Sequence, residues 1–520
     1  MTGPAADRAA ELDGPGVRRL TRNSAAQRAV TTLGARIGDA WSTLVSVAVG
    51  LALLGGWLHS LRAAVVGRAP GSGTVLPAAV TALAAGVVAV AALTTLLDRL
   101  GPVSASPAAA AWWLPLPADR GRLLRGELGR VTGATAATTA LLCLPLAAVW
   151  SRPPSFPGIA TTVLGATASA AGLVGVVALL QTRGRRGVLG PVTGAVAVGA
   201  GALAAVLAVS PWAADALARA SRHGLPGIGL PGAVVAVVLA AGVLVAATRG
   251  LGRLRAGALR AAGAASAFAA ASVFSLDTRD LGRALASAPR TPRTGRRLTL
   301  VRHPWQAVAA ADLLLLGRSP WQCGQVVLAT SIPVLAARTD GLDRLPAATA
   351  IGLVTGWLVA AVAVGSPARS AHAAPAIDRL LPLSSAQVIA ARCVAPAVVL
   401  AVVCGLSGLL VGVGSPHPAA WVALALGSVP TWTAAALRGA YRPELDWSGA
   451  VVSSPMGVIP AGIGATLVQG VDVGVAGALP LVLIVLTGAD PSPALIAVQV
   501  AWALGLAAAA LIHLGRRRTT

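Results

Sequence analysis

The sequence is dominated by long apolar stretches that alternate with short polar ones. Stretches of about 20 residues rich in Ala, Val, Leu and Gly recur along the chain, and each is long enough to cross a bilayer as a helix. The pattern therefore predicts an all-α, polytopic transmembrane bundle. We place its twelve expected spans near residues 40–61, 74–97, 131–150, 159–181, 189–209, 231–248, 322–338, 346–366, 393–412, 419–437, 474–489 and 493–514.

One further apolar segment, 451–469, is ambiguous. It is long enough to span, but it contains two prolines and several glycines. If it does not span, the arginines at 516–518 fall on the same side of the membrane as the N-terminus. The positive-inside rule favours that arrangement, with 451–469 interfacial or re-entrant. We therefore expect a multi-pass protein of the plasma membrane with both termini cytoplasmic, in which 34 of the 41 arginines lie in cytoplasmic segments.

The same pattern divides the chain into two similar halves. Each half begins with an interfacial lead-in helix, near 17–37 or 306–316, and continues with two spans, a cytoplasmic loop and four more spans. An even number of spans per half predicts a parallel repeat, in which both copies face the same way. The expected divisions are a cytoplasmic N-terminal segment, a first six-span half, a basic cytoplasmic linker, a second six-span half and a cytoplasmic tail, at 1–39, 40–248, 249–321, 322–514 and 515–520.

A short stretch recurs in the cytoplasmic loop of each half. Leu114-Pro115-Leu116 is matched 267 residues later by Leu381-Pro382-Leu383, and the same offset relates Arg125 to Arg392. Asp119 and Ser384 are suitable helix caps, and Ser384 with Gln387 has the spacing of a capping box. We expect each copy to be a short polar helix at the membrane surface. A chance match is the alternative, since Leu and Pro are common in this chain.

Composition narrows the class of protein. With 56% hydrophobic and 11% charged residues, the chain is not an ordinary soluble protein. Its net charge is +23, and all of its basic residues are arginine. A P-loop requires a lysine that contacts the nucleotide phosphates, so this chain has no standard nucleotide-binding domain. The basic excess is typical of membrane topology rather than of nucleic-acid binding.

The sequence offers little catalytic or metal-binding chemistry. Its six histidines are scattered, its four cysteines form no CxxC pair, and no paired-carboxylate or nucleophile motif appears. We expect no enzyme activity, no cofactor and no metal. Asp39, Asp98 and His513 lie near the ends of apolar segments, so ionisable groups deep in the membrane are nearly absent, which argues against proton-coupled transport.

The two Leu-Pro-Leu stretches are the remaining candidates. The first carries Arg122, Arg125 and Arg130 together with Leu124 and Leu128. Such a helix could dock in a groove of a soluble partner. It could equally lie on the membrane with its arginines at lipid phosphates. The residues alone leave both readings open.

This layout resembles the permease subunits of ABC-2-type exporters. In that family a half-transporter has a cytoplasmic N-terminus, a lead-in helix, six spans and a coupling helix in the first cytoplasmic loop, which inserts into an ATPase subunit. The Leu-Pro-Leu stretches are similar to sequences that precede the third span there. The chain is also similar to an uncharacterised actinobacterial membrane-protein family. It departs from the usual permease in having both halves in one polypeptide and no large extracellular domain.

The resemblance implies a permease subunit of an ABC-2-like exporter, energised by a separate P-loop ATPase, with membrane lipid as a further partner and no nucleic acid. One chain would supply both transmembrane halves. The alternative is a non-transporting scaffold or assembly protein with a basic cytoplasmic face. The residues that would contact the ATPase are Leu114, Pro115, Leu116, Asp119, Arg122, Arg125, Glu127, Leu381, Pro382, Leu383, Ser384, Gln387 and Arg392.

Overall fold

The computed structural model divides the chain into two compact units, which are considered one at a time. Unit 1 comprises Met1–Ala64, Val90–Thr193 and Leu225–Pro289, and unit 2 comprises Val65–Ala89, Gly194–Gly224 and Arg290–Thr520. Apart from single residues between 16 and 56 and at 376 and 378, the structure describes residues 75–116, 119–150, 155–220, 229–274, 301–374, 380–413, 415–442, 451–454, 457–460 and 469–519.

Eight helices in the described part of the chain are long and apolar enough to cross a membrane. They are Ala78–Leu100, Phe156–Thr182, Leu189–Val209, Leu230–Arg253, Pro346–Val364, Ser385–Gly412, Pro418–Ala440 and Pro493–Arg516. The expectation of an all-α, multi-pass membrane protein is confirmed at this level. The first expected span, 40–61, and the lead-in helix at 17–37 lie outside the described residues, apart from a few isolated positions.

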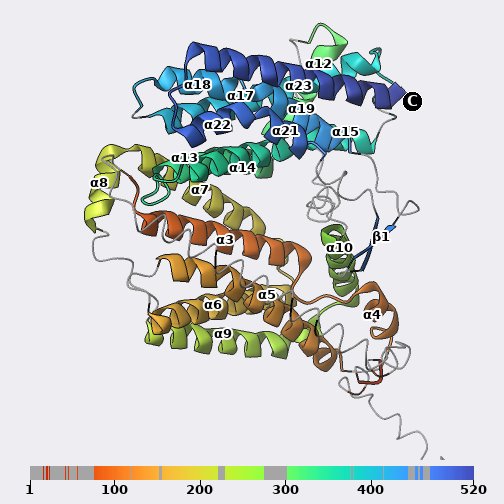
Figure 1. Cartoon of the computed structure of the whole chain (residues 1–520). Coiled ribbons are helices and arrows are strands. Elements are labelled where there is room, and N and C mark those ends of the chain that lie inside the picture. Colours follow the sequence, from red (N-terminus) through yellow and green to blue (C-terminus); the bar gives the residue numbers. More distant parts are fainter. Residues whose placement is uncertain are drawn as a thin grey trace, which may run out of the picture. The chain divides into compact units, whose positions relative to one another are not determined.

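Unit 1 is a helical bundle in which α6 (Phe156–Thr182) packs against both α5 (Arg120–Trp150) and α9 (Leu230–Gly250) (Figure 1). It contains the C-terminal part of α3 (Ala78–Leu100) and the first residues of α7 (Leu189–Val209). Its core includes Leu97, Val103, Leu128, Val174 and Leu259. The other elements of unit 1 are α4 (Pro107–Trp112), η3 (Leu251–Arg253) and α10 (Ala256–Phe274).

Small residues let α6 and α9 pack closely. A Cβ added at Gly172 would lie 3.4 Å from the Cα of Ala240, and one at Gly175 would lie 3.2 Å from the backbone nitrogen of Leu244. Close backbone approach at small residues is the usual way in which membrane helices associate. The contact fixes the relative positions of the two helix ends.

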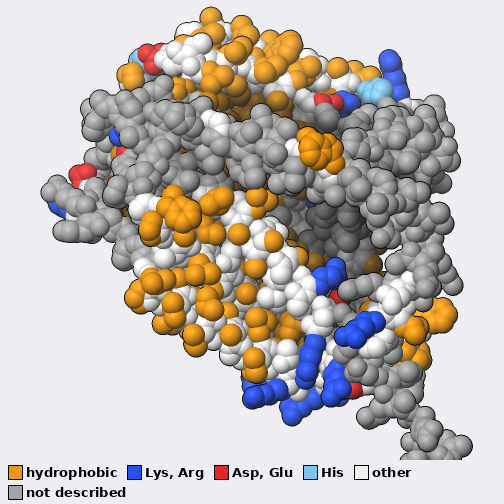
Figure 2. Space-filling model, turned by 60° about the horizontal axis from the view of Figure 1, so that its bottom comes forward, with side chains coloured by type: hydrophobic (Ala, Val, Ile, Leu, Met, Phe, Trp, Pro, Cys, Tyr) orange, Lys and Arg blue, Asp and Glu red, His pale blue; other side chains and the backbone are white. Residues whose placement is uncertain are grey.

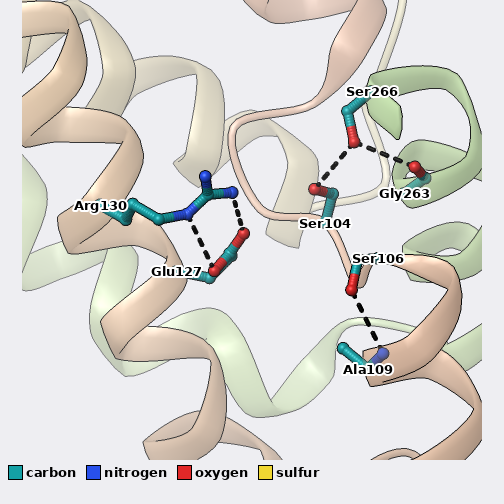
Figure 3. A network of polar contacts seen from close by, with 7 residues as sticks. All are labelled: Ser104, Ser106, Ala109, Glu127, Arg130, Gly263 and Ser266. Carbon is teal, nitrogen blue, oxygen red and sulfur yellow. Dashed lines mark hydrogen bonds and ion pairs between the residues drawn. The ribbon is translucent and has the colours of Figure 1, made fainter. Parts of the chain in front are cut away.

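Helix α10 lies within the segment expected to be a linker. Its residue Gly263 packs on the loop between α3 and α4, where the backbone nitrogen of Ala105 donates to the carbonyl of Leu259 at 3.3 Å. The hydroxyls of Ser104 and Ser266 are 3.3 Å apart (Figure 3). The beginning of the expected linker, up to residue 274, is therefore a structural part of unit 1.

Substitution of Gly263 tests this packing. An added Cβ would lie 1.6 Å from the carbonyl oxygen of Ala105, so the loop or the helix must move. We expect Gly263→Ala to lower the free energy of unfolding by about 2 kcal/mol, measured by thermal unfolding in detergent. Gly257→Ala, in the same helix with open space around its Cβ, is the control and should not destabilise the protein. Equal melting temperatures for the two variants would contradict this packing.

Unit 2 is a larger helical bundle that also includes the N-terminal part of α3 and most of α7. Trp357 and Trp432 are fully buried in its core and meet edge to face, with ring centroids 6.3 Å apart. Its other helices are α8 (Pro211–Ala220), α12 (Pro304–Gly317), α13 (Pro320–Arg338), α14 (Pro346–Val364), α15 (Ser366–Ala373), α17 (Ser385–Gly412), α18 (Pro418–Leu426), α19 (Val429–Ala440), α21 (Val471–Gly477), α22 (Leu479–Thr487) and α23 (Pro493–Thr519).

A side chain from α23 occupies the break between α21 and α22. The backbone N–H of Leu481 donates to Gln499 Oε1 at 3.1 Å, and Gln499 Nε2 donates to the carbonyl of Gly477 at 2.8 Å and to Ser428 Oγ at 3.1 Å. In an unbroken helix Leu481 would donate to Gly477 directly. The amide of Gln499 is therefore inserted into the hydrogen-bond ladder, which is a known cause of helix kinks.

The same break frees a second carbonyl because Pro480 has no N–H to donate to Ala476. Trp502, one turn after Gln499, donates its indole N–H to that carbonyl at 2.8 Å. Neighbouring side chains thus satisfy the backbone groups that an interrupted membrane helix exposes.

The ambiguous segment 451–469 contains strands where it is described. β1 (Val451–Ser454) pairs antiparallel with β2 (Gly457–Pro460). Residues 451–454 and 457–460 are therefore strands and not part of a spanning helix. A two-stranded ladder leaves open edges, which are not tolerated where backbone faces lipid hydrocarbon.

Candidate functional site

The first Leu-Pro-Leu stretch forms the turn between α4 and α5. The N–H of Leu116 donates to the carbonyl of Trp113 at 3.3 Å. Leu114 is buried in the core of unit 1, Leu116 is half-buried and Pro115 is exposed. The first leucine therefore anchors the turn, while the proline and, in part, the second leucine reach the surface.

Both predicted caps are present, but the short helices are not. Asp119 Oδ1 accepts from the N–H of Gly121 at 2.8 Å, and Ser384 forms a reciprocal capping box with Gln387 at 3.3 and 2.9 Å. From these caps α5 and α17 run without interruption through 31 and 28 residues. The expectation of separate surface helices was wrong because no breaker stops either helix: Pro396 lies inside α17 and does not end it.

The first two turns of α5 have two distinct faces. Leu123, Leu124 and Leu128 are buried, whereas Arg122 and Arg125 are exposed. Arg122 lies 3.5 Å from Asp119, and Arg125 has no ion-pair partner among the described residues. We call Pro115, Leu116, Arg122 and Arg125 the first Leu-Pro-Leu surface.

A small, shallow depression lies beside this surface. Its lining is mostly apolar, with Trp113, Leu123 and Leu124, and its charged groups are Arg120 and Glu127. Figure 3 shows Glu127 paired with Arg130, one turn further along α5, near the Ser104–Ser266 contact and the Ser106 cap of α4. The depression is therefore mainly apolar, with one basic and one acidic side chain in its lining.

The second Leu-Pro-Leu stretch presents a different surface. Pro382, Ser384 and Gln387 are exposed, and Leu381 and Leu383 are half-buried. Arg392, the counterpart of Arg125, is only 7% exposed. This residue therefore does not present its guanidinium to a partner, contrary to the role expected for it.

Arg392 is instead enclosed between two carboxylates. Its Nη1 lies 3.0 and 3.1 Å from the two oxygens of Asp312, and its Nη2 lies 2.5 Å from Asp378 Oδ1. Asp312 belongs to α12, Asp378 precedes the Leu-Pro-Leu turn and Arg392 belongs to α17. We call these three residues the Arg392 cluster. Its ion pairs connect three segments of unit 2.

Burial has the largest effect on the pKa of Asp312. It raises the pKa of Asp312 above its usual range, the positive charge of Arg392 opposes that rise, and the nearby Asp378 adds to it. Within the Arg392 cluster, one guanidinium is shared by two carboxylates.

Sequence reasoning missed this cluster. The sequence pattern places Asp312 in an expected interfacial lead-in helix and Asp378 in an expected cytoplasmic loop. Acidic side chains at such positions are usually solvated. The available signal was a single acid within the apolar run 307–316, because an isolated charge in such a run requires a partner.

The sequence around Arg125 differs from that around Arg392 at the matching positions. The same 267-residue offset places Val45 and Ala111 at the positions of Asp312 and Asp378. The first copy therefore lacks both carboxylates at the matching positions. The two copies share the Leu-Pro-Leu motif but differ in the environment of their arginine.

The described part of the chain has no group of three or more His, Cys, Asp or Glu side chains suited to a metal ion.

Comparison with known proteins identifies a family: residues 72–450 match the model of a family of unknown function, DUF6297. Because the match covers well over half of the sequence, the chain belongs to that family. No curated protein and no solved structure matches it.

Proposed function

We propose that this DUF6297 member is the membrane-spanning permease subunit of an ABC-2-like exporter, energised by a separate P-loop ATPase. The ATPase docks on the first Leu-Pro-Leu surface. The observation that carries the proposal is the pair of exposed arginines, Arg122 and Arg125, on a helix whose opposite face is anchored in the core.

The continuity of α5 gives this surface a mechanical role. A helix of 31 residues is about 46 Å long. A displacement imposed by the ATPase near Arg122 would therefore pass along one rigid element into the apolar part of the bundle. A separate surface helix would need a rigid connection to the spanning helix to transmit the same displacement.

We further propose twelve spans in two parallel six-span halves, with both termini cytoplasmic in the plasma membrane. Helix α13 and the interrupted pair α21–α22 lie where two further spans are expected. The hairpin at 451–460 supports a non-spanning role for that segment. On this topology the first Leu-Pro-Leu surface and the Arg392 cluster are on the cytoplasmic side.

The two halves then differ in how they bind the ATPase. Charge-assisted contacts to acidic groups require an exposed guanidinium. Arg125 is exposed, while Arg392 is held by Asp312 and Asp378. We propose that docking on the first half depends on charge and that any docking on the second depends on Pro382 and Gln387.

Purification of the tagged full-length chain in mild detergent tests the proposal. We expect a P-loop ATPase to co-purify and to hydrolyse ATP in the complex, and Arg125→Glu to remove it. Arg219→Glu is the matched control, because Arg219 is an exposed arginine of α8 in an expected external loop, and it should leave the ATPase bound.

Two outcomes would contradict the proposal. The first is a folded, purified chain with no ATPase under conditions that preserve other transporter complexes, which would favour a non-transporting scaffold. The second is equal loss of the ATPase from Arg125→Glu and Arg219→Glu, because docking would then not involve the first Leu-Pro-Leu surface.

A further inference from the structure

A second basic feature of unit 1 lies where α6 and α9 end. The two helices meet at Thr182 and Gly250, where an added Cβ on the glycine would lie 2.9 Å from Thr182 Oγ1. Four exposed arginines adjoin this contact in the sequence. They are Arg183, Arg185, Arg249 and Arg253, and we call them the α6–α9 arginines. Figure 2 shows basic side chains gathered on one part of the described surface.

These charges are not neutralised by described side chains. None of the α6–α9 arginines forms an ion pair within the part of the chain that the structure describes. The acids of this end have other partners: Asp98 accepts from the N–H groups of Gly187 and Gly190, both at 2.9 Å, and Asp119 lies beside Arg122. The α6–α9 arginines therefore form an uncompensated positive patch.

The backbone that carries Arg183 and Arg185 is held in place. The turn contains Gly184 and Gly187, with φ values of +72° and +80°, which suit glycine. Asp98 binds the turn at Gly187, and Arg186 Nη2 donates to the carbonyl of Arg99 at 2.5 Å. A patch on a fixed turn loses little conformational entropy when it binds an anion.

An apolar stripe leads to the patch along α9. Val234, Val238, Val245 and Arg249 follow one another at intervals of four, seven and four residues, so they share one face of the helix. The three valines are 49%, 64% and 50% exposed. Since α9 is one of the candidate membrane spans, this face meets lipid.

We propose that the α6–α9 arginines bind the headgroup of an anionic phospholipid, with its acyl chain along the valine stripe. Guanidinium groups bind phosphate oxygens through paired, charge-assisted hydrogen bonds. Basic groups at the end of a membrane helix attract anionic headgroups. The adjoining valine stripe favours a lipid over a free phosphate, because a free phosphate has no apolar group to pack against the valines. This site does not depend on the exporter proposal.

Native mass spectrometry of the full-length chain in detergent tests the site. Phosphatidylglycerol and phosphatidylcholine with the same acyl chains are titrated separately. We expect phosphatidylglycerol to bind more tightly, and Arg183→Gln with Arg249→Gln to weaken it by about 30-fold, from the loss of two juxtamembrane charges. Arg302→Gln with Arg318→Gln removes the same charge from exposed positions of unit 2 and should leave the affinity unchanged.

Three results would overturn the site. Equal binding of the two lipids would remove the requirement for an anionic headgroup. Equal weakening by the two double variants would show attraction to net charge alone. Displacement of the lipid by an equal concentration of glycerol phosphate, which lacks acyl chains, would assign the patch to a soluble phosphate.

Discussion

Replacing Arg392 by glutamine is expected to lower the free energy of unfolding by about 3–5 kcal/mol. The substitution removes the guanidinium that pairs with both Asp312 and Asp378, which are buried. The measurement is thermal or chemical unfolding of the purified chain in detergent. Arg125→Gln is the matched control, because Arg125 occupies the same repeat position but is exposed and has no described ion pair, and it should change stability by less than about 0.5 kcal/mol.

Two additional measurements make the prediction specific to charge. Combining Arg392→Gln with Asp312→Asn and Asp378→Asn removes all three charges and should recover part of the lost stability. The deficit of Arg392→Gln alone should also shrink as the pH falls. Burial raises the pKa of Asp312, and Arg392 opposes that rise. Without Arg392 the pKa rises further, so protonation of Asp312 stabilises the folded variant at low pH, and this contribution is lost as the pH rises through the folded pKa. Equal stability of Arg392→Gln and Arg125→Gln would contradict the claim that the ion pairs of the Arg392 cluster stabilise the folded protein.

The second large effect is expected at Gln499, which is fully buried. Gln499→Leu removes hydrogen bonds to Leu481, Gly477 and Ser428 at a helix break. At about 1 kcal/mol for each bond, the expected loss is about 3 kcal/mol, again measured by unfolding in detergent. Gln325→Leu is the control, because Gln325 is a half-buried residue of α13. Its side chain has no hydrogen-bond partner among the described residues, so this substitution should have little effect on stability.

The alternative outcome at Gln499 has a clear structural meaning. If α21 and α22 straighten when the amide is removed, Leu481 donates directly to Gly477 and most of the stability is retained. A melting temperature equal to that of Gln325→Leu would therefore show that the inserted amide is not needed to stabilise the break.

The apolar pattern predicted the membrane helices well where polar or helix-breaking residues flank them. The expected span 189–209 coincides with α7, and that at 346–366 differs from α14 by two residues at one end. Glycine, proline and arginine at the edges of such stretches limit the positions at which a helix can begin and end. The pattern failed at α5 and α17, because polar residues in the first turns of a helix look the same whether or not it continues into an apolar stretch.

The candidate site was predicted only in part. The caps at Asp119 and Ser384 follow from local sequence, since each binds a backbone group within three residues. The different environments of Arg125 and Arg392 do not, because the partners of Arg392 lie 80 and 14 residues away. The position of Gln499 in the α21–α22 break likewise depends on the register of α23, which no local pattern specifies.

Photo-crosslinking in native membranes tests the central proposal most directly. A photo-reactive phenylalanine analogue is placed at position 116 of the first Leu-Pro-Leu surface and, as the control, at position 219 of α8. The proposal predicts a crosslink from position 116 to a P-loop ATPase and none from position 219. Crosslinks from position 116 to lipid alone, in a chain that remains folded, would contradict ATPase docking at this surface.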